Sequence, residues 1–348
     1  MNSLKFIAYS SILLFALACG GEKDPSKLFS IKLDGNKKNF QVNQAVPVTI
    51  NNKAEKSIEN VSYSIDGKPL TVNDNKINLD VTKLGNKVLN AEIDYEGTSV
   101  TISKKIKVLA SSAPVVYTYE IINEFPHDMD AYTQGLEFHN DTLYEGTGKK
   151  GKSSLRKIKY STGEVLEKID LENTFFGEGI TILDDKIYQL TWQSNIGFVY
   201  DIQNFKKTGS FQYGKSKEGW GLCNNGERLF KSDGTEKIWL LNPETLVEED
   251  YIQTVTNKSI FNMANELEYV DGKIYANVWQ KESMMIIDAK TGAIEGVINF
   301  GGLKNKTQKP DNTDAVLNGV AYHPKRKTFF VTGKYWDKLF EVRIMKKE

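Results

Sequence analysis

The sequence has few of the residues that build metal centres or nucleic-acid interfaces. Its only histidines are His127, His139 and His323, and their spacing is not that of metal ligands. We therefore expect no metal and no cofactor, and we expect His127 and His323 at the surface. Lysine and arginine together number 45, as do aspartate and glutamate, and no basic stripe is visible. Nucleic acid is accordingly a poor candidate for the partner.

Long hydrophobic runs are also missing, apart from Phe6–Leu17. This run follows Lys5 and is too short for a membrane span, so residues 1–18 are predicted to be a secretory signal peptide. Its end, Ala16-Leu17-Ala18-Cys19, resembles the lipobox of bacterial lipoproteins, with alanine where leucine is usual. We expect a lipid on Cys19, a tether over residues 19–27, and an exported lipoprotein anchored to a membrane of the bacterial cell envelope. An ordinary signal peptide cut nearby is the alternative.

Cysteine is scarce, and the chain has only two, Cys19 and Cys223. If Cys19 carries a lipid, Cys223 is the one remaining thiol, which excludes an intramolecular disulfide. Cys223 could be a nucleophile. However, a lone cysteine in a strand-like run such as Gly221-Leu222-Cys223 is more often a small buried apolar residue, and we expect that role here.

Aromatic and β-branched residues are abundant, including 16 tyrosines and 17 phenylalanines, which favours an all-β chain. Residues 28–110 contain short alternating runs separated by turn signals such as Asp66-Gly67 and Glu96-Gly97. The runs are Phe29–Leu33, Val46–Ile50, Val61–Ile65, Lys76–Asp80, Lys87–Tyr95 and Ser99–Val108. They predict a small immunoglobulin-like β-sandwich, with a spacer or adhesion role because it has no histidine and no acid/base cluster. Residues 111–114 read as a linker.

A repeat begins after the linker and fills residues 115–348. Its units open at Gln134, Glu178, Trp220, Asn265 and Asn318, which are 44, 42, 45 and 53 residues apart. In each unit a turn and a second strand with an aromatic residue follow, and then signals for further strands. Four strands at a period in the forties predict a β-propeller, here with five blades. The last unit is one strand short, and Val115–Asn123 is the expected donor of the missing strand.

Two sets of positions should meet at one mouth of the central channel of such a propeller. The first set is the opening residues, and the second lies at the ends of the second strands, because antiparallel neighbours bring these ends together. The second set is Gly148, Trp192, Gly234, Trp279 and Lys334. Tyr132 and Phe176 each lie two residues before an opening position, and we expect their rings to line the same mouth. A lone acid, Glu178, among indoles, amides and a lysine is a setting that raises a carboxyl pKa for acid/base chemistry. The alternative is that the tryptophans only pack the blades.

At these residues the sequence resembles the plant-type glutaminyl-peptide cyclotransferases, which also occur in bacteria. The motifs that carry the resemblance are Tyr132-Thr-Gln-Gly-Leu136, Phe176-Gly-Glu-Gly179, Leu190-Thr-Trp192, Gly219-Trp-Gly221, Asn265-Glu-Leu-Glu268, Asn277-Val-Trp279 and Val331-Thr-Gly-Lys-Tyr-Trp336. The resemblance implies that Glu178 is the catalytic acid/base. It implies that the substrate is bound by aromatic and polar side chains, namely Tyr132, Phe176, Trp192, Trp220, Trp279, Gln134, Asn265 and Lys334. The repeat adds Asn318 to this set.

The implied reaction converts an N-terminal glutamine of a peptide or protein to pyroglutamate and releases ammonia, without a metal. We expect the enzyme to be a monomer. Two other functions stay open. A propeller that only binds peptides would need the same pocket. A metal-dependent propeller hydrolase would need several inward carboxylates, for which only Glu178 and Glu266 qualify.

Overall fold

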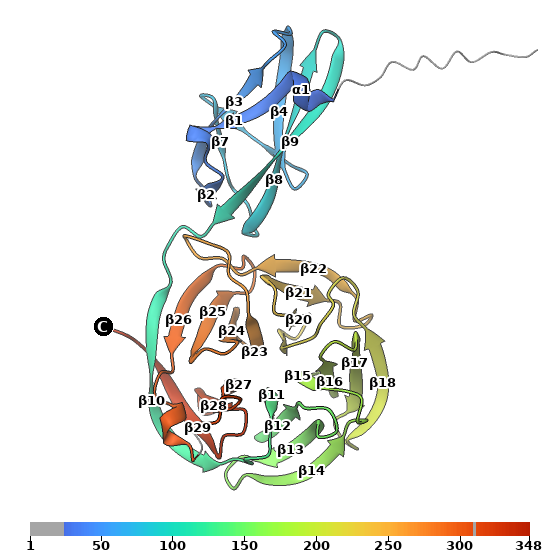
Figure 1. Cartoon of the computed structure of the whole chain (residues 1–348), viewed down its shortest axis with the longest axis vertical. Coiled ribbons are helices and arrows are strands. Elements are labelled where there is room, and N and C mark those ends of the chain that lie inside the picture. The colour runs from blue at the N-terminus through green and yellow to red at the C-terminus, as the bar shows by residue number, and fades with distance from the viewer. Residues whose placement is uncertain (1–23, 309–310) are drawn as a thin grey trace, which may run out of the picture.

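Figure 1 shows the computed structural model of the chain, which describes residues 24–308 and 311–348. The predicted signal peptide and Cys19 lie outside these residues. The described chain is almost entirely β, as predicted, with one short α-helix, α1 (Pro25–Leu28), at the end of the expected tether. Asp24 caps α1 through Ser26 N, and Pro25 occupies its first turn, both of which favour a helix start. None of the helices in the described residues has the length and hydrophobicity needed to cross a membrane.

The N-terminal strands form two sheets. Their bounds are β1 (Phe29–Leu33), β2 (Asn39–Gln41), β3 (Ala45–Asn52), β4 (Ile58–Ile65), β5 (Lys68–Leu70), β6 (Val72–Asn73), β7 (Lys76–Asn78), β8 (Gly85–Tyr95) and β9 (Thr98–Leu109). One sheet has the order β1-β3-β7-β6 and the other β2-β9-β8-β4-β5. The turns at Asp66-Gly67 and Glu96-Gly97 have positive φ at both residues, as tight hairpins require. Alternate side chains of both sheets, among them Phe29 and Leu89, form one hydrophobic core.

Three antiparallel four-stranded sheets follow in chain order. The first contains β11 (Thr133–His139), β12 (Thr142–Thr147), β13 (Ser154–Lys159) and β14 (Glu164–Asp170). The second contains β15 (Gly177–Leu183), β16 (Lys186–Thr191), β17 (Ile196–Asp201) and β18 (Lys206–Gln212). The third contains β19 (Leu222–Asn224), β20 (Leu229–Ser232), β21 (Lys237–Leu241) and β22 (Glu248–Gln253).

The remaining strands join in one eight-stranded sheet of order β23-β24-β25-β26-β10-β29-β28-β27. They are β23 (Ala264–Val270), β24 (Lys273–Val278), β25 (Ser283–Asp288), β26 (Ile294–Asn299), β27 (Leu317–His323), β28 (Thr328–Gly333), β29 (Lys338–Lys346) and, from before the repeat, β10 (Val115–Pro126). β10 pairs antiparallel with β29, the last strand of the chain, along most of its length. It also pairs over three residues, parallel, with β26. Residues 115–123 thus supply a strand to the last unit, as predicted.

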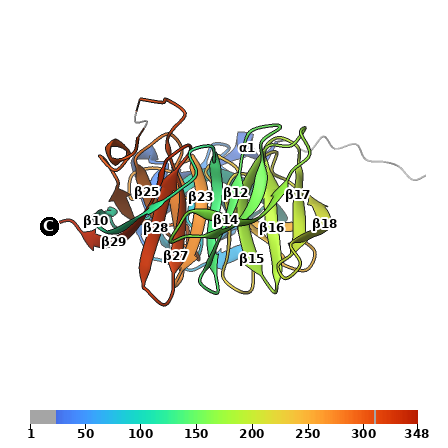
Figure 2. The same cartoon turned by 90° about the horizontal axis from the view of Figure 1, so that it is seen from below.

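The first strands of successive groups contact one another in a closed ring, β11-β15-β19-β23-β27 and back to β11. Figure 1 shows them around the centre, with β14, β18, β22 and β10 at the periphery. In the side view of Figure 2 the central strands run across the thickness of this ring. Each strand therefore ends at one of the two faces, which places equivalent ends of neighbouring strands together.

The N-terminal sheets dock on the ring through backbone hydrogen bonds at their lower end in Figure 1. Leu84 N donates to Thr291 O at 2.9 Å, and Ala110 N donates to Thr256 O at 3.2 Å. Asn86 N donates to the side chain of Gln253 at 2.7 Å. Val255, which follows β22, is part of the N-terminal hydrophobic core. The contact therefore includes apolar burial as well as hydrogen bonds.

The prediction that His127 and His323 lie at the surface is wrong. His127 is buried where the chain leaves β10 and crosses to β11, and its two ring nitrogens contact Trp336 O at 2.8 Å and Glu145 Oε1 at 3.1 Å. His323 is buried at the end of β27, with its ring 4.7 Å from that of Phe138. Both positions owe their burial to partners far away in the sequence, which a local pattern does not reveal.

Candidate active site

A pocket of about 240 Å³ lies at the mouth of the ring where the first strands begin. Its lining is aromatic and polar and consists of Tyr132, Gln134, Lys149, Phe176, Glu178, Trp192, Trp220, Asn265, Trp279 and Lys334. The structure thus brings together every residue that the sequence predicted for the site except Asn318, and it adds Lys149.

One backbone hydrogen bond recurs at this mouth and explains the meeting of the two predicted sets. The residue after a second strand donates its N–H to the carbonyl two residues before the opening residue. The bonds are Gly148 to Tyr132 at 2.8 Å and Trp192 to Phe176, Trp279 to Met263 and Lys334 to Val316, each at 2.9 Å. Each of these four bonds fixes the second-strand end beside the opening residue of the same hairpin, which brings Trp192, Trp279 and Lys334 to the pocket.

Glycines after the opening residues allow the first strands to approach closely. A Cβ on Gly135 would lie 2.4 Å from Ile180 N, and one on Gly179 would lie 2.6 Å from Trp220 O. Gly179 N donates to this same carbonyl at 2.7 Å. Only glycine permits this contact, and it holds Glu178 against the neighbouring Trp220.

Glu178 is 4% exposed, and its Oε2 has no hydrogen-bond partner among the described residues. Burial raises the pKa of Glu178 well above its ordinary value. The charge of Lys334 and the amide of Gln134 oppose this rise, and the charge of Glu218 adds to it. A buried carboxyl oxygen without a partner is costly to the fold, and the Glu178 side chain that carries it lines a pocket that a ligand can enter. This combination is typical of functional acids and bases.

Lys334 supplies positive charge beside Glu178. It is 3% exposed, and its ammonium lies 4.5 Å from the centre of the Tyr132 ring. Burial lowers the pKa of Lys334 to about 8, although the Glu178 charge raises it. Lys149 stacks on the same ring at 4.3 Å and lowers this pKa further by repulsion. The pocket therefore holds an ammonium whose pKa is lowered by burial and by the Lys149 charge.

The indoles are held by a carboxylate that sequence reasoning missed. Glu218 Oε2 accepts hydrogen bonds from Trp192 Nε1 at 2.7 Å and from Trp220 Nε1 at 2.8 Å. Its other oxygen accepts from Gln193 Nε2 at 3.2 Å. A signal for Glu218 was present, because it stands two residues before an opening position, as Tyr132 and Phe176 do. One acid thus fixes two walls of the pocket.

The remaining aromatic contacts extend this wall. The Phe176 ring lies 5.5 Å from that of Trp192 and 5.9 Å from that of Tyr132, both edge to face. The rings of Trp220 and Trp279 are 5.9 Å apart. Such pairs stabilise one another and leave little freedom to the side chains. The pocket is accordingly preformed.

Asn318 does not line the pocket, which corrects its prediction as a substrate contact. It is fully buried, and its Nδ2 donates to Thr133 O and to Gln134 Oε1, both at 2.9 Å. These bonds use the amide nitrogen of Asn318, whereas its Oδ1 has no hydrogen-bond partner among the described residues. Because Gln134 Oε1 accepts from Asn318, the amide nitrogen of Gln134 is the group left to face the pocket. Asn318 therefore positions Gln134.

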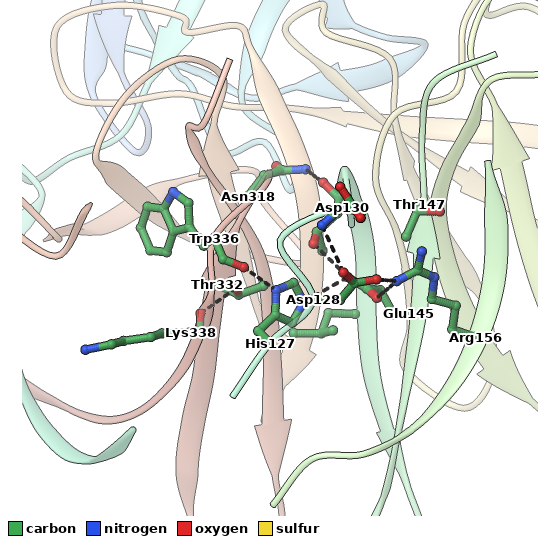
Figure 3. A network of polar contacts seen from close by, with 12 residues as sticks. His127, Asp128, Asp130, Glu145, Thr147, Arg156, Asn318, Thr332, Trp336 and Lys338 are labelled. Atoms are coloured by element: carbon green, nitrogen blue, oxygen red, sulfur yellow. Dashed lines mark hydrogen bonds and ion pairs between the residues drawn. The ribbon is translucent and has the colours of Figure 1, made fainter. Parts of the chain in front are cut away.

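A buried ionic network around Glu145 contacts the start of β11, the strand that carries Gln134 (Figure 3). Glu145 Oε1 accepts from Thr133 Oγ1 at 2.7 Å and contacts His127 Nε2 at 3.1 Å. Arg156 lies 3.7 Å from the other oxygen of Glu145 and 2.7 Å from Asp128. Burial disfavours both charges, but the pairing prevails and lowers the pKa of Glu145 while raising that of His127. The network anchors Thr133, the residue before Gln134.

Glu266 and Cys223 lie outside the pocket. Glu266 Oε1 accepts from Leu136 N at 3.2 Å and its Oε2 from Val320 N at 2.8 Å, which bridges three first strands. Cys223 is buried in a hydrophobic cluster, as expected, and burial raises the pKa of its thiol. Among residues 24–308 and 311–348, no group of three or more His, Cys, Asp and Glu side chains is placed to hold a metal ion.

Known proteins resemble the part of the chain that builds this site. The family model described as glutamine cyclotransferase matches residues 94–344. The glutaminyl-peptide cyclotransferase of Arabidopsis thaliana is 40% identical over 253 residues, which is 71% of this chain and 75% of the relative. The crystal structure of Myxococcus xanthus glutaminyl cyclase superposes with a TM-score of 0.63 at 33% identity and covers 68% of this chain and 100% of its own. The chain therefore belongs to the glutamine cyclotransferase family.

Proposed function

We propose that this protein is a glutaminyl-peptide cyclotransferase that acts on peptides or proteins with an N-terminal glutamine. The α-amine attacks the side-chain carboxamide carbon of the same residue, the bond from that carbon to the amide nitrogen breaks, and pyroglutamate and ammonia form. The observation that carries the proposal is Glu178, a buried carboxyl with one unpartnered oxygen inside a preformed aromatic pocket. Membership of the family supports it independently.

The pocket supplies the conformation that the reaction needs. A free glutaminyl side chain is flexible, and ring closure requires the amine and the carboxamide carbon to approach within van der Waals contact. Trp192, Trp220 and Trp279 restrict the space to about 240 Å³, which favours a folded side chain over an extended one. Holding reacting groups in such a geometry removes much of the entropic part of the barrier.

Glu178 transfers the proton. Its carboxylate takes a proton from the attacking amine, and the resulting carboxyl then delivers one to the departing nitrogen, which leaves as ammonia. A pKa raised by burial brings this group closer to the working pH, where proton transfer in both directions is efficient. The substrate amine has an ordinary pKa of about 8, so a fraction of it is already neutral and no strong base is required.

Negative charge that develops on the carboxamide oxygen needs nearby donors. Lys334 and the amides of Gln134 and Asn265 line the same pocket and are the candidates. Asn318 orients the Gln134 amide for this purpose. Donors that are already in place stabilise such charge without reorganisation, which is often the largest single contribution to catalysis.

We further propose the finer architecture and the location of the protein. The closed ring of first strands, with β10 completing the last group, supports a five-bladed β-propeller over residues 115–348. The two N-terminal sheets around one core support an immunoglobulin-like sandwich over residues 28–110, joined by the linker at 111–114. The sequence of residues 1–27 supports a signal peptide, a lipid on Cys19 and attachment to a membrane of the cell envelope. We expect the enzyme to act as a monomer.

A coupled ammonia assay on the full chain tests the activity. A peptide with free N-terminal glutamine should release one ammonia per pyroglutamate formed, as followed by mass spectrometry. The same peptide with an acetylated amine, or with glutamine in the second position, should release none. Binding of the free peptide without ammonia release would instead establish the alternative, a peptide-binding propeller.

The metal-independent route has its own test. Activity should be unchanged after incubation with EDTA and after dialysis, because the proposed acid, donors and cage are all side chains of this chain. Loss of activity with EDTA and its recovery with zinc or calcium would overturn this route.

A further inference from the structure

The catalytic pocket has room for little more than one residue. Sites for drug-sized ligands are roughly 300–1,000 Å³, whereas this pocket is about 240 Å³. A peptide substrate whose N-terminal glutamine fills the pocket must therefore leave it at the second residue. The rest of the peptide has to lie on the neighbouring surface.

A second cavity of about 570 Å³ adjoins the pocket. The two share Trp220, and Glu218, which accepts a hydrogen bond from this indole, lines the second cavity. We call the second cavity the lysine groove, after Lys215, Lys217 and Lys237 in its lining. It is open to solvent and more than twice as large as the pocket, which suits several residues of an extended peptide.

The three acids that line the lysine groove, Glu218, Asp233 and Glu236, already accept hydrogen bonds from neighbouring groups of the protein. Glu218 accepts from the two indoles described above. Asp233 Oδ2 accepts from Trp239 Nε1 at 2.7 Å, and its other oxygen accepts from Thr235 N at 3.0 Å. Glu236 Oε1 accepts from Gln253 Nε2 at 3.0 Å. None of the three forms an ion pair within 4.0 Å with a lysine of the groove.

The lysines, by contrast, are uncommitted. None of Lys215, Lys217 and Lys237 has a carboxylate within 4.0 Å in the part of the chain that the structure describes. Lys237 is held over the rings of Trp239 and Tyr251, with its ammonium 4.9 and 4.5 Å from their centres. Aromatic faces orient an ammonium but leave its protons free to donate. The groove therefore presents three ammonium groups that can donate to a ligand next to the pocket, although its lining has as many acids as lysines.

We propose that the lysine groove is the subsite for the residues that follow the N-terminal glutamine, and that it favours acidic side chains at those positions. This inference rests on the proposed function of the pocket. A carboxylate of the substrate would complete ion pairs that the protein leaves open, which adds specificity through charge complementarity at contact. Because the groove is open, each pair should contribute at most about fivefold in affinity, and salt should weaken it.

The experiment compares kcat/KM of the full chain for three peptides. Gln-Ala serves as the reference, and two longer peptides of equal length carry either two aspartates or two lysines after Gln-Ala. At low ionic strength the aspartate peptide should exceed the lysine peptide by about five- to twentyfold, and the ratio should fall to about two at 1 M salt. Replacement of the three groove lysines by glutamine (Lys215→Gln, Lys217→Gln and Lys237→Gln) should abolish the preference and leave kcat/KM for Gln-Ala unchanged.

A matched control removes the same charge elsewhere. Lys32, Lys68 and Lys105 are exposed lysines of the N-terminal sheets, and their replacement by glutamine should keep the preference. An equal rate for both longer peptides, or an equal loss of preference in both triple variants, would overturn the proposal. Failure to cyclise Gln-Ala would instead contradict the proposed function itself, so the two failures are distinguishable.

Discussion

The Glu178 pocket and the Glu145 network adjoin at Thr133 and Gln134, and each buries one glutamate. Glu145 is fully buried but has His127, Arg156 and Thr133 as partners, and its pKa lies below the ordinary value. Each of the two has one oxygen without a hydrogen-bond partner among the described residues, but Glu178 forms no ion pair within 4.0 Å there and its pKa is raised. The difference teaches that partners, more than burial, separate a structural acid from one available for chemistry. A carboxyl with buried counter-charges beside it stays ionised and stabilises the fold, whereas one without an ion pair can exchange protons with a substrate.

The largest effect should come from breaking the structural side of this comparison. Glu145→Ala leaves His127 and Arg156 without their buried counter-charge, and losing one partner of a buried pair costs about 3–5 kcal/mol. Urea denaturation of the variant should show this loss. Glu120→Ala, which removes an exposed pair with Arg343, should change stability by no more than about 1 kcal/mol. Equal effects in the two variants would show that the buried network is not what holds this end of β11.

A smaller effect is expected at the pocket wall. Glu218→Gln keeps the size of the side chain but replaces a charged acceptor for two indole N–H groups by a single neutral one. We expect kcat/KM for a glutamine dipeptide to fall about tenfold, which corresponds to ~1.4 kcal/mol. Tryptophan fluorescence should change as well, because Trp192 and Trp220 lose their fixed partner. Wild-type kcat/KM with altered fluorescence would mean that the orientation of the indoles is not required.

The smallest change is a displacement of the pH profile. Lys334 is charged below its pKa of about 8 and loses its proton as the pH rises through that value. If the ammonium supports the developing charge, kcat should decline above about pH 8 in the wild type. In Lys334→Arg the decline should move to higher pH, because a guanidinium stays protonated beyond pH ~12. Coincident alkaline limbs in the two proteins would exclude this role for Lys334.

The sequence correctly predicted the position of those residues whose placement depends only on the geometry of the repeated hairpin. A hairpin brings its first-strand opening and its second-strand end together whatever else surrounds it, so Glu178, Trp192, Trp279 and Lys334 were placed correctly at one mouth. The strand that completes the last group was predicted for a similar reason, since the count of strands in that unit was one short.

Other features depend on partners that are distant in the sequence. Asn318 occupies an opening position, but the carbonyl of Thr133, 185 residues earlier, captures its amide. His127 is buried because Trp336 and Glu145 meet around it. Lys149 reaches the pocket from beyond the end of β12, where no periodic signal exists. Glu218, like Phe176, stands two residues before an opening position. Its role, however, depends on the orientation of the Trp192 and Trp220 indoles that donate to it.

The central claim is that the buried carboxyl that lines the pocket does the chemistry while a buried carboxyl outside it does not, and Glu178→Gln beside Glu266→Gln tests it. Both substitutions convert a buried acid to its amide, but Glu266 has backbone donors on both oxygens. The measurement is ammonia release per folded molecule at saturating glutamine dipeptide. We predict a fall in kcat of about 10²-fold or more for Glu178→Gln and a change within about threefold for Glu266→Gln. Turnover near the wild-type value in Glu178→Gln would contradict the account.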